Sequence, residues 1–334
     1  MISSPENYGL SGEETLAKQT EALCPQNFEA FWADFREAVL TLPTHWQGSL
    51  DHETNQVIIA SMRDIRVIAQ VTMPPQTPVG VVLTTHGYEA PDIFEDDHEP
   101  WTEHGLVTVR LRVRGFPPSV MDMDDVRRDW ILHGIESPEA WVLLGAVGDV
   151  VLAYRCARMA FGPDLPIAMH GESFGGGLAV LASAQLSALD DSPFRLVLGL
   201  PTFGDWAWRD GHYCNGSGGL VNQLLDIHRG DQREQLMQSL LLFDATLHAP
   251  AISCPALTKL AHIDDTVPAP SAASIHNALG SSHKWRFETK YGHFDGGLSD
   301  LRRHAQFERI HPGFLDPQFE LEKWTESTKI TFEL

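Results

Sequence analysis

Basic residues are scarce in this sequence of 334 amino acids. It contains 24 Lys and Arg against 45 Asp and Glu, which gives a formal net charge of −21 at pH 7. Binding to nucleic acid depends on Lys and Arg that neutralise phosphates, and docking on an anionic membrane needs a polybasic segment. The charge therefore argues against both kinds of partner.

Cysteines and long apolar runs are also rare. The cysteines lie far apart, form no CxxC pair and show no zinc-type spacing: Cys24, Cys156, Cys214 and Cys254. So few thiols argue against a disulfide scaffold. No apolar run approaches the roughly 18 residues that a membrane span needs, and the N-terminal residues lack the basic and apolar regions of a signal peptide. We therefore expect a cytoplasmic protein that does not associate with membranes.

Short apolar runs of β-forming residues alternate along the chain with segments of helical periodicity. Hydrophobic residues make up 43% of the sequence and charged residues 21%, a composition typical of globular proteins. The alternation predicts the α/β class, with a mostly parallel sheet and helices on both faces. The expected strands are 56–62, 65–72, 80–85, 106–113, 166–170, 195–200, 256–261 and 284–289, and the expected helices are 27–41, 137–161, 178–189, 269–279 and 299–309.

No internal repeat or long polar linker divides the sequence, so we expect a single domain over residues 1–334. Residues 1–45 would form an N-terminal helical extension, and residues 311–334 a C-terminal tail. Residues 201–255 lie between two expected strands and are too many for an ordinary loop. We interpret them as a lid-like insertion that covers a site or sets specificity.

Residues 171–175 read Gly-Glu-Ser-Phe-Gly, a complete GxSxG motif. An apolar strand is expected before it and a helix of small residues after it, which is the context of a nucleophile on a sharp strand-to-helix turn. A tight turn in which the serine only caps the helix is the plain structural alternative. The motif makes Ser173 the candidate nucleophile.

A serine nucleophile needs a general base, and the base needs a carboxylate that orients it. In this architecture the partners follow in the order serine, acid, histidine, each just beyond a strand. Downstream of Ser173, two expected strands lead into His-Ile-Asp-Asp and into Tyr-Gly-His. Asp264 is therefore the candidate acid, with Asp265 as its rival, and His293 is the candidate general base.

Acyl transfer also needs N–H donors for the oxyanion that forms on the ester carbonyl. One donor is expected from the residue after the nucleophile and the other from the loop after an early strand. The backbone N–H groups of Phe174 and Tyr88 occupy these positions. They are assigned from position, because a backbone donor places little constraint on the side chain.

Further motifs occur in a recognisable order: HGY at 86–88, RG at 114–115, GESFGGG at 171–177, IDDTVPAPS at 263–271 and GH at 292–293. This series resembles the acetyl xylan esterases and cephalosporin C deacetylases, carbohydrate esterase family seven of the α/β-hydrolase superfamily, over most of the chain. The resemblance implies an α/β-hydrolase fold and a serine esterase that cleaves short-chain acetyl esters, of sugars or related small molecules, with no cofactor or metal. It maps the acid onto Asp264 and not Asp265. It also implies a closed homo-oligomer.

Three positions depart from the pattern of that family. Where the family has RGQ, GxSQGG and HE, this chain has Phe116, Phe174 and Phe294. Polar side chains near the site are thus replaced by apolar ones, which indicates a divergent member. Aromatic residues near the motifs and in the insertion are candidate substrate contacts: Phe116, Phe294, Trp206 and Trp208. For the two tryptophans, packing of the insertion is the alternative.

An acidic run, DIFEDDHE at 92–99, follows the candidate oxyanion residue Tyr88. If this run borders the pocket, like charges should repel anionic esters. We therefore expect a preference for neutral esters, such as acetylated sugars.

Three other functions stay open at this point. The same fold also hosts dienelactone hydrolases, peptidases and thioesterases. A non-catalytic binding protein is a second alternative, and a metal hydrolase that uses His262, Asp264 and Asp265 is a third. The metal reading predicts sensitivity to chelators, whereas a serine mechanism does not.

Overall fold

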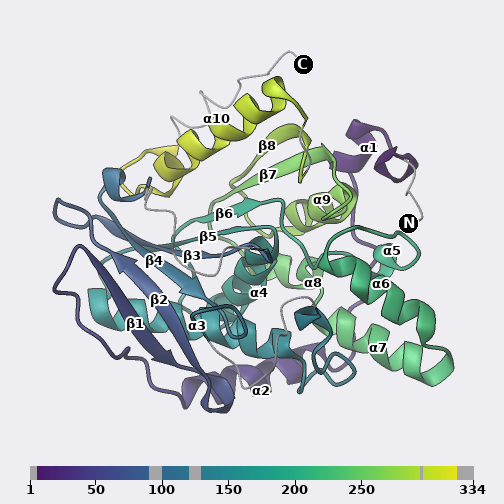
Figure 1. The fold of residues 1–334 in the computed structure, drawn as a ribbon, viewed down its shortest axis with the longest axis horizontal. Coiled ribbons are helices and arrows are strands. Elements are labelled where there is room, and N and C mark those ends of the chain that lie inside the picture. The colour runs from purple at the N-terminus through teal and green to yellow at the C-terminus, as the bar shows by residue number, and fades with distance from the viewer. Residues whose placement is uncertain (1–5, 90–99, 120–128, 294–295, 322–334) are drawn as a thin grey trace.

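An eight-stranded sheet forms the centre of the molecule, with the strand order β1-β2-β4-β3-β5-β6-β7-β8 (Figure 1). A computed structural model describes residues 6–89, 100–119, 129–293 and 296–321. Neighbouring strands pair in parallel, except β1 with β2 and β2 with β4. The sheet confirms the predicted α/β class. The strands are β1 (Thr54–Ala60), β2 (Arg66–Thr72), β3 (Gly80–Thr85), β4 (Leu106–Arg112), β5 (Ile167–Glu172), β6 (Leu196–Gly199), β7 (Ala256–Ile263) and β8 (Lys284–Tyr291).

Helices cover both faces of this sheet. The α-helices of the described residues are α1 (Gly12–Leu16), α2 (Phe28–Leu40), α3 (Val142–Phe161), α4 (Phe174–Ala188), α5 (Trp206–Arg209), α6 (Ser217–Ile227), α7 (Gly230–Leu242), α8 (Ala245–His248), α9 (Ala269–Ala278) and α10 (Leu298–Leu315). None of them is long and apolar enough to cross a membrane.

Alternate residues of the central strands pack on opposite faces of the sheet. On β3, Val81 and Leu83 belong to the large core that also contains the buried residues of α2, α3 and α4. Val82, between them, belongs to a second core with Phe307 and Phe314 of α10. Successive side chains of a strand point to opposite faces, so a strand covered on both sides reads as a continuous apolar run.

Helix α3 begins later than the sequence predicts. The expected start at residue 137 is wrong, because residues 137–141 form a turn in which the Ser137 carbonyl accepts the N–H groups of Ala140 and Trp141. Trp141 has an extended ψ of 130°, and its buried ring donates a hydrogen bond to the Ile131 carbonyl at 2.7 Å. Anchoring of the Trp141 ring therefore delays α3 until Val142.

Two other helices are longer than predicted. The helix expected from residue 178 begins at Phe174, because glycines 175–177 weaken the helical signal of the sequence although the chain is already helical there. The helix expected to end at residue 309 continues to Leu315, where Phe314 and Leu315 are fully buried. The segment expected as a tail over 311–334 thus begins inside α10, and residues 322–334 lie outside the described part of the chain.

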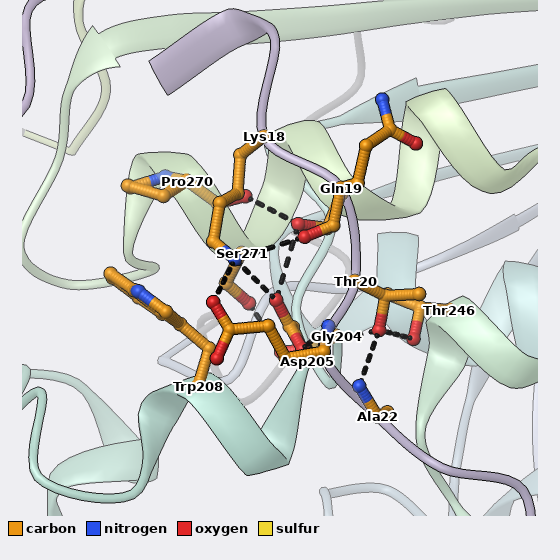
Figure 2. A network of polar contacts seen from close by, with 12 residues as sticks. Lys18, Gln19, Thr20, Ala22, Gly204, Asp205, Trp208, Thr246, Pro270 and Ser271 are labelled. Atoms are coloured by element: carbon orange, nitrogen blue, oxygen red, sulfur yellow. Dashed lines mark hydrogen bonds and ion pairs between the residues drawn. The ribbon is translucent and has the colours of Figure 1, made fainter. Parts of the chain in front are cut away.

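The insertion over 201–255 carries α5, α6, α7 and α8, of which α5, α6 and α7 lie together at the right of the view in Figure 1. The N-terminal segment binds the insertion through the buried Asp205, which accepts hydrogen bonds from the Thr20 hydroxyl at 3.1 Å and the Glu21 N–H at 2.8 Å. Figure 2 shows Lys18, Thr20 and Asp205 in this network. The ammonium of Lys18 lies 3.5 Å from the same carboxylate. The N-terminal extension therefore packs on the insertion.

Candidate active site

Ser173 lies on the turn between β5 and α4. Its φ of 55° and ψ of −114° are unusual for a residue with a side chain, as expected for a strained nucleophile turn. The flanking glycines permit this turn. A Cβ at Gly171 would overlap the backbone of Gly175, and a Cβ at Gly175 would lie 2.7 Å from the carbonyl oxygen of Thr85.

The structure brings Ser173, His293 and Asp264 together from three separate loops. Nε2 of His293 lies 3.0 Å from Oγ of Ser173, and Nδ1 lies 2.7 Å from Oδ2 of Asp264. Asp264 is 1% exposed, and its Oδ1 accepts the N–H groups of Thr266 at 2.9 Å and Val267 at 3.2 Å. The carboxylate is thus fixed by the loop after β7 and presents its second oxygen to His293.

Gly292 makes the approach of these loops possible. A Cβ at this position would overlap the carboxylate of Asp264, and the N–H of Gly292 donates to the Ile263 carbonyl at 3.0 Å. The glycine before the histidine therefore lets the loop after β8 lie against the loop after β7.

Asp264 raises the pKa of His293. Burial alone would lower this pKa, but the hydrogen bond to Asp264, the negative charge of Asp264 and the charge of Glu172 together outweigh burial. The positive charge of Lys259 acts in the opposite direction. Because the carboxylate can only accept, Nδ1 carries the ring proton when His293 is neutral, and the lone pair of Nε2 faces Ser173.

The rival acid, Asp265, has a different partner. Its Oδ2 accepts the side-chain amide of Asn215 at 2.6 Å. His262 faces Glu288 on β8 at 3.1 Å. Across the described ranges, no group of three or more His, Cys, Asp or Glu is arranged to hold a metal ion.

The loop of residues 86–88, where the second oxyanion donor is expected, is held by the ring of His86. The Val113 N–H donates to its Nε2 at 3.3 Å, so Nδ1 carries the proton and donates to the Gly87 carbonyl at 2.9 Å. Burial lowers the pKa of His86 to about 3, which keeps the ring neutral. The loop that carries Tyr88 is thus fixed next to the start of α4.

Tyr88 and Phe174, the predicted oxyanion residues, touch each other through their side chains. Their rings meet edge to face at 5.5 Å, and both pack on Phe116 and Trp130. The Ile131 N–H also donates to the Tyr88 hydroxyl at 3.1 Å. Phe174 is the first residue of α4, and the first N–H groups of a helix have no acceptor within the helix. The Phe174 N–H, which directly follows Ser173, therefore has no acceptor within α4.

The residues predicted to touch substrate are mostly packed inside the protein. Phe116 is 3% exposed, Trp206 1% and Trp208 7%. Trp206 stacks on the Arg209 guanidinium, 4.2 Å from its ring centre, and Trp208 stacks on His212 at 4.1 Å. Packing within the insertion accounts for these contacts, and a role in substrate binding stays a prediction. Phe294 and the acidic run 92–99 lie outside the described residues.

Two ion pairs near the site, each with a buried cation, do not follow from the sequence motifs. The guanidinium of Arg114 pairs with Asp149 of α3 at 2.7 Å, and the ammonium of Lys259 pairs with Glu172. Each had a sequence signal: an Asp inside the apolar stretch LLGAVGDVVLA, and a Lys inside the apolar strand ALTKLA. A charge in such a place usually has a buried partner.

A serine on a strand-to-helix turn, followed along the chain by an aspartate and a histidine at the ends of later strands, defines an α/β-hydrolase. Within this class, the chain belongs to the acetyl xylan esterase family, whose model matches residues 7–310. The protein is accordingly a carboxylic ester hydrolase.

Solved structures of low sequence identity share the fold. The acetyl xylan esterase from Paenibacillus sp. R4 is 20% identical over 90% of this chain and 98% of its own, with a TM-score of 0.74. Acetyl xylan esterase 1 from Thermoanaerobacterium sp. JW/SL YS485 is 17% identical over 89% and 98%, with a TM-score of 0.72. The hyperthermophilic esterase from the archaeon Pyrobaculum calidifontis is 15% identical over 87% and 93%, with a TM-score of 0.56. Comparison with the curated proteins gives no significant match.

Proposed function

We propose that this protein is a serine esterase that hydrolyses short-chain esters, above all acetyl esters of sugars or related small molecules. The observation that carries the proposal is the pair of hydrogen bonds on the His293 ring, one with Ser173 and one with Asp264. Membership of the acetyl xylan esterase family supports the acetyl group as the acyl part of the substrate.

In the first half of the proposed reaction, Oγ of Ser173 attacks the ester carbonyl carbon while its proton moves to Nε2 of His293. The N–H groups of Phe174 and Tyr88 stabilise the oxyanion of the tetrahedral intermediate. The bond to the alcohol oxygen then breaks, and His293 returns the proton to the leaving alcohol. This step leaves an acyl group on Ser173.

In the second half, a water molecule gives a proton to His293 and attacks the acyl carbon. The tetrahedral intermediate collapses, Ser173 leaves and recovers the proton, and the carboxylic acid is released. Asp264 keeps the imidazole in the required tautomer and stabilises the imidazolium that forms in both halves. No cofactor takes part in this scheme.

A series of p-nitrophenyl esters of increasing acyl length tests the substrate class. We expect the highest kcat/KM for acetate and a fall with chain length. A preference for octanoate or longer chains would reject the acetyl assignment.

Replacement of the nucleophile tests the mechanism. Ser173→Ala should lower kcat by about 10⁶-fold, because nucleophile and base act as a unit, whereas Ser187→Ala at the other end of α4 should leave kcat near wild type. A fluorophosphonate probe should label the wild type at Ser173 only. Absence of labelling would favour a binding protein, and loss of activity with chelators would favour a metal hydrolase.

Assembly into a closed homo-oligomer, which the family resemblance implies, is a further part of the proposal. Sedimentation velocity of the full chain tests it, and a single species of monomer mass would reject it.

A further inference from the structure

Three residues lie side by side across the strands that lead into the site. Glu172 at the end of β5 is in register with Gly199 of β6, and Gly199 is in register with Lys259 of β7. Residues in register on parallel strands send their side chains to the same face of the sheet. Glu172 and Lys259 therefore share a face and are separated by one residue without a side chain.

Gly199 is what lets the two charges meet. A Cβ at this position would lie 2.9 Å from Cγ and 3.0 Å from Cδ of Glu172, closer than carbon atoms pack. The Glu172 side chain thus lies over Gly199, and its carboxylate forms an ion pair with the ammonium of Lys259. Any other residue at 199 would occupy the path of Glu172.

Burial of Lys259 makes a counter-charge necessary. Only 3% of the Lys259 side chain is exposed, and a buried ammonium needs a counter-charge. Burial alone would raise the pKa of Glu172, but the adjacent Lys259 outweighs this effect and lowers it to about 2. The second neighbour of Lys259 is Glu308 of α10, at 3.6 Å, with the ring of Phe307 at 4.9 Å.

The ion pair connects the strands of two site residues. Glu172 directly precedes Ser173, whose N–H donates to the Gly199 carbonyl at 2.7 Å. Lys259 lies on β7, the strand that leads into Asp264, and its carbonyl accepts the Leu200 N–H at 3.0 Å. A shift of β5 against β7 would separate the pair, so the pair opposes such a shift.

Both charges also act on His293. The charged groups that act on this ring come from three elements: Asp264 and Asp265 from the loop after β7, Glu172 from the end of β5, and Lys259 from β7. Glu172 raises the pKa of His293, and Lys259 lowers it. Around the pair itself lie the neutral rings of His170 on β5 and His311 on α10, whose pKa values burial lowers.

We propose that Glu172 and Lys259 are positioning residues of this esterase: their ion pair over Gly199 holds the Ser173 turn in register with the strand of Asp264. The proposal rests on the proposed role of His293 as general base. Glu172 occupies the position of GxSxG that can be any residue, and Lys259 lies inside a strand and outside every motif described above.

The test compares the acid limb of the pH profile of kcat/KM for p-nitrophenyl acetate, which reports the protonation of the free enzyme. In Glu172→Gln we expect the acid limb to move to lower pH, because a negative charge near His293 is lost. In Lys259→Met we expect it to move to higher pH, because a positive charge is lost while Glu172, whose side chain is 40% exposed, stays ionised. The double variant should lie between the two. Glu37→Gln on the exposed face of α2 is the matched control and should leave the profile unchanged.

A second variant tests the geometry with both charges present. Gly199→Ala should push Glu172 away from Lys259, and we expect a lower kcat with an unchanged KM, as for a misplaced nucleophile. This variant and Glu172→Gln keep the test valid if Lys259→Met does not fold, which circular dichroism will show. Acid limbs that coincide with wild type in the folded variants, together with an unchanged kcat in Gly199→Ala, would overturn the proposal.

Failure of the general-base mechanism gives a different result. If Ser173→Ala keeps its activity, or if the wild type shows no acid limb, the proposed function is wrong. If the wild type has an acid limb, Ser173→Ala is inactive and the pair variants match wild type, only the role of Glu172 and Lys259 is wrong.

Discussion

Asn215 of the insertion holds Asp265 through two hydrogen bonds. Its backbone N–H donates to the Asp265 carbonyl at 2.7 Å, and its side-chain amide donates to Oδ2 at 2.6 Å. Two adjacent aspartates are thereby divided in function: Asp264 faces His293, and Asp265 ties the insertion to the loop that carries Asp264.

This division predicts unequal effects of the same substitution. Asp264→Asn should lower kcat by about 10⁴-fold, because the amide cannot hold His293 in the required tautomer. Asp265→Asn keeps an acceptor for Asn215 and should change kcat by less than about 10-fold. Steady-state kinetics on p-nitrophenyl acetate measures both. Equal losses would show that the two carboxylates share the task.

The activity should fall in mild acid. His293 acts as a base only when it is neutral, and Asp264 raises the pKa of its ring. We therefore expect the acid limb of kcat/KM above pH 6.5, the ordinary value for histidine. A stopped assay over pH 5–9 measures it, with circular dichroism at each pH to exclude unfolding. An acid limb below pH 6.5 would contradict the raised pKa.

The free energy of unfolding should also fall as the pH falls, through buried histidines that take no part in the proposed proton transfer. Burial lowers the pKa of His86 to about 3, and those of His170, His248 and His276 to about 4. Between pH 6.5 and 4 the unfolded chain therefore binds more protons than the folded one, so the free energy of unfolding falls as the pH falls. Each ring accounts for up to about 3 kcal/mol at pH 4.

Asp244 acts in the opposite direction, because burial raises its pKa to about 6. The folded chain then binds the extra proton between about pH 6 and 4, which offsets the contribution of about one histidine. Urea unfolding at pH 7, 6 and 5 measures the net effect. A free energy of unfolding that stays constant over this range would contradict the prediction.

The Arg114–Asp149 pair should be needed for folding stability. The carboxylate of Asp149 accepts the N–H of Arg114 at 2.9 Å and the guanidinium at 2.7 and 3.0 Å, and both side chains are buried. Asp149→Ala leaves the cation unpaired and should cost about 3–5 kcal/mol in the free energy of unfolding. The double variant Arg114→Met with Asp149→Leu should recover most of this loss. Urea unfolding tests both, and a neutral Asp149→Ala would be unexpected.

Phe174 allows the backbone role to be separated from the side chain. Phe174→Ala removes a ring that is 1% exposed and should cost about 3–5 kcal/mol in the free energy of unfolding. The N–H at position 174 remains, so kcat of the folded fraction should fall by less than about 10²-fold, the loss expected when an oxyanion donor is removed. Kinetics below the unfolding transition tests this, and a larger loss would assign the ring itself a role.

The sequence alone determined the α/β class and the order of the site residues. Both depend on local signals: apolar runs that end in loops, and the glycines around Ser173 and before His293. Such signals do not show where a helix begins when tertiary contacts decide it. Trp141 delays α3 because its ring is anchored to the Ile131 carbonyl, a contact that no local pattern contains.

Only the tertiary structure decided which partners meet across the sheet. The sequence pattern left open whether Asp264 or Asp265 is the acid, and the resemblance to a family favoured Asp264. In the structure, Asp264 faces His293 and Asp265 faces Asn215. Glu172 and Lys259 are 87 residues apart in the sequence. They meet because β5, β6 and β7 are in register and because Gly199 has no side chain in the path of Glu172. Register between distant strands is set by packing of the whole core, and no short stretch of sequence specifies it.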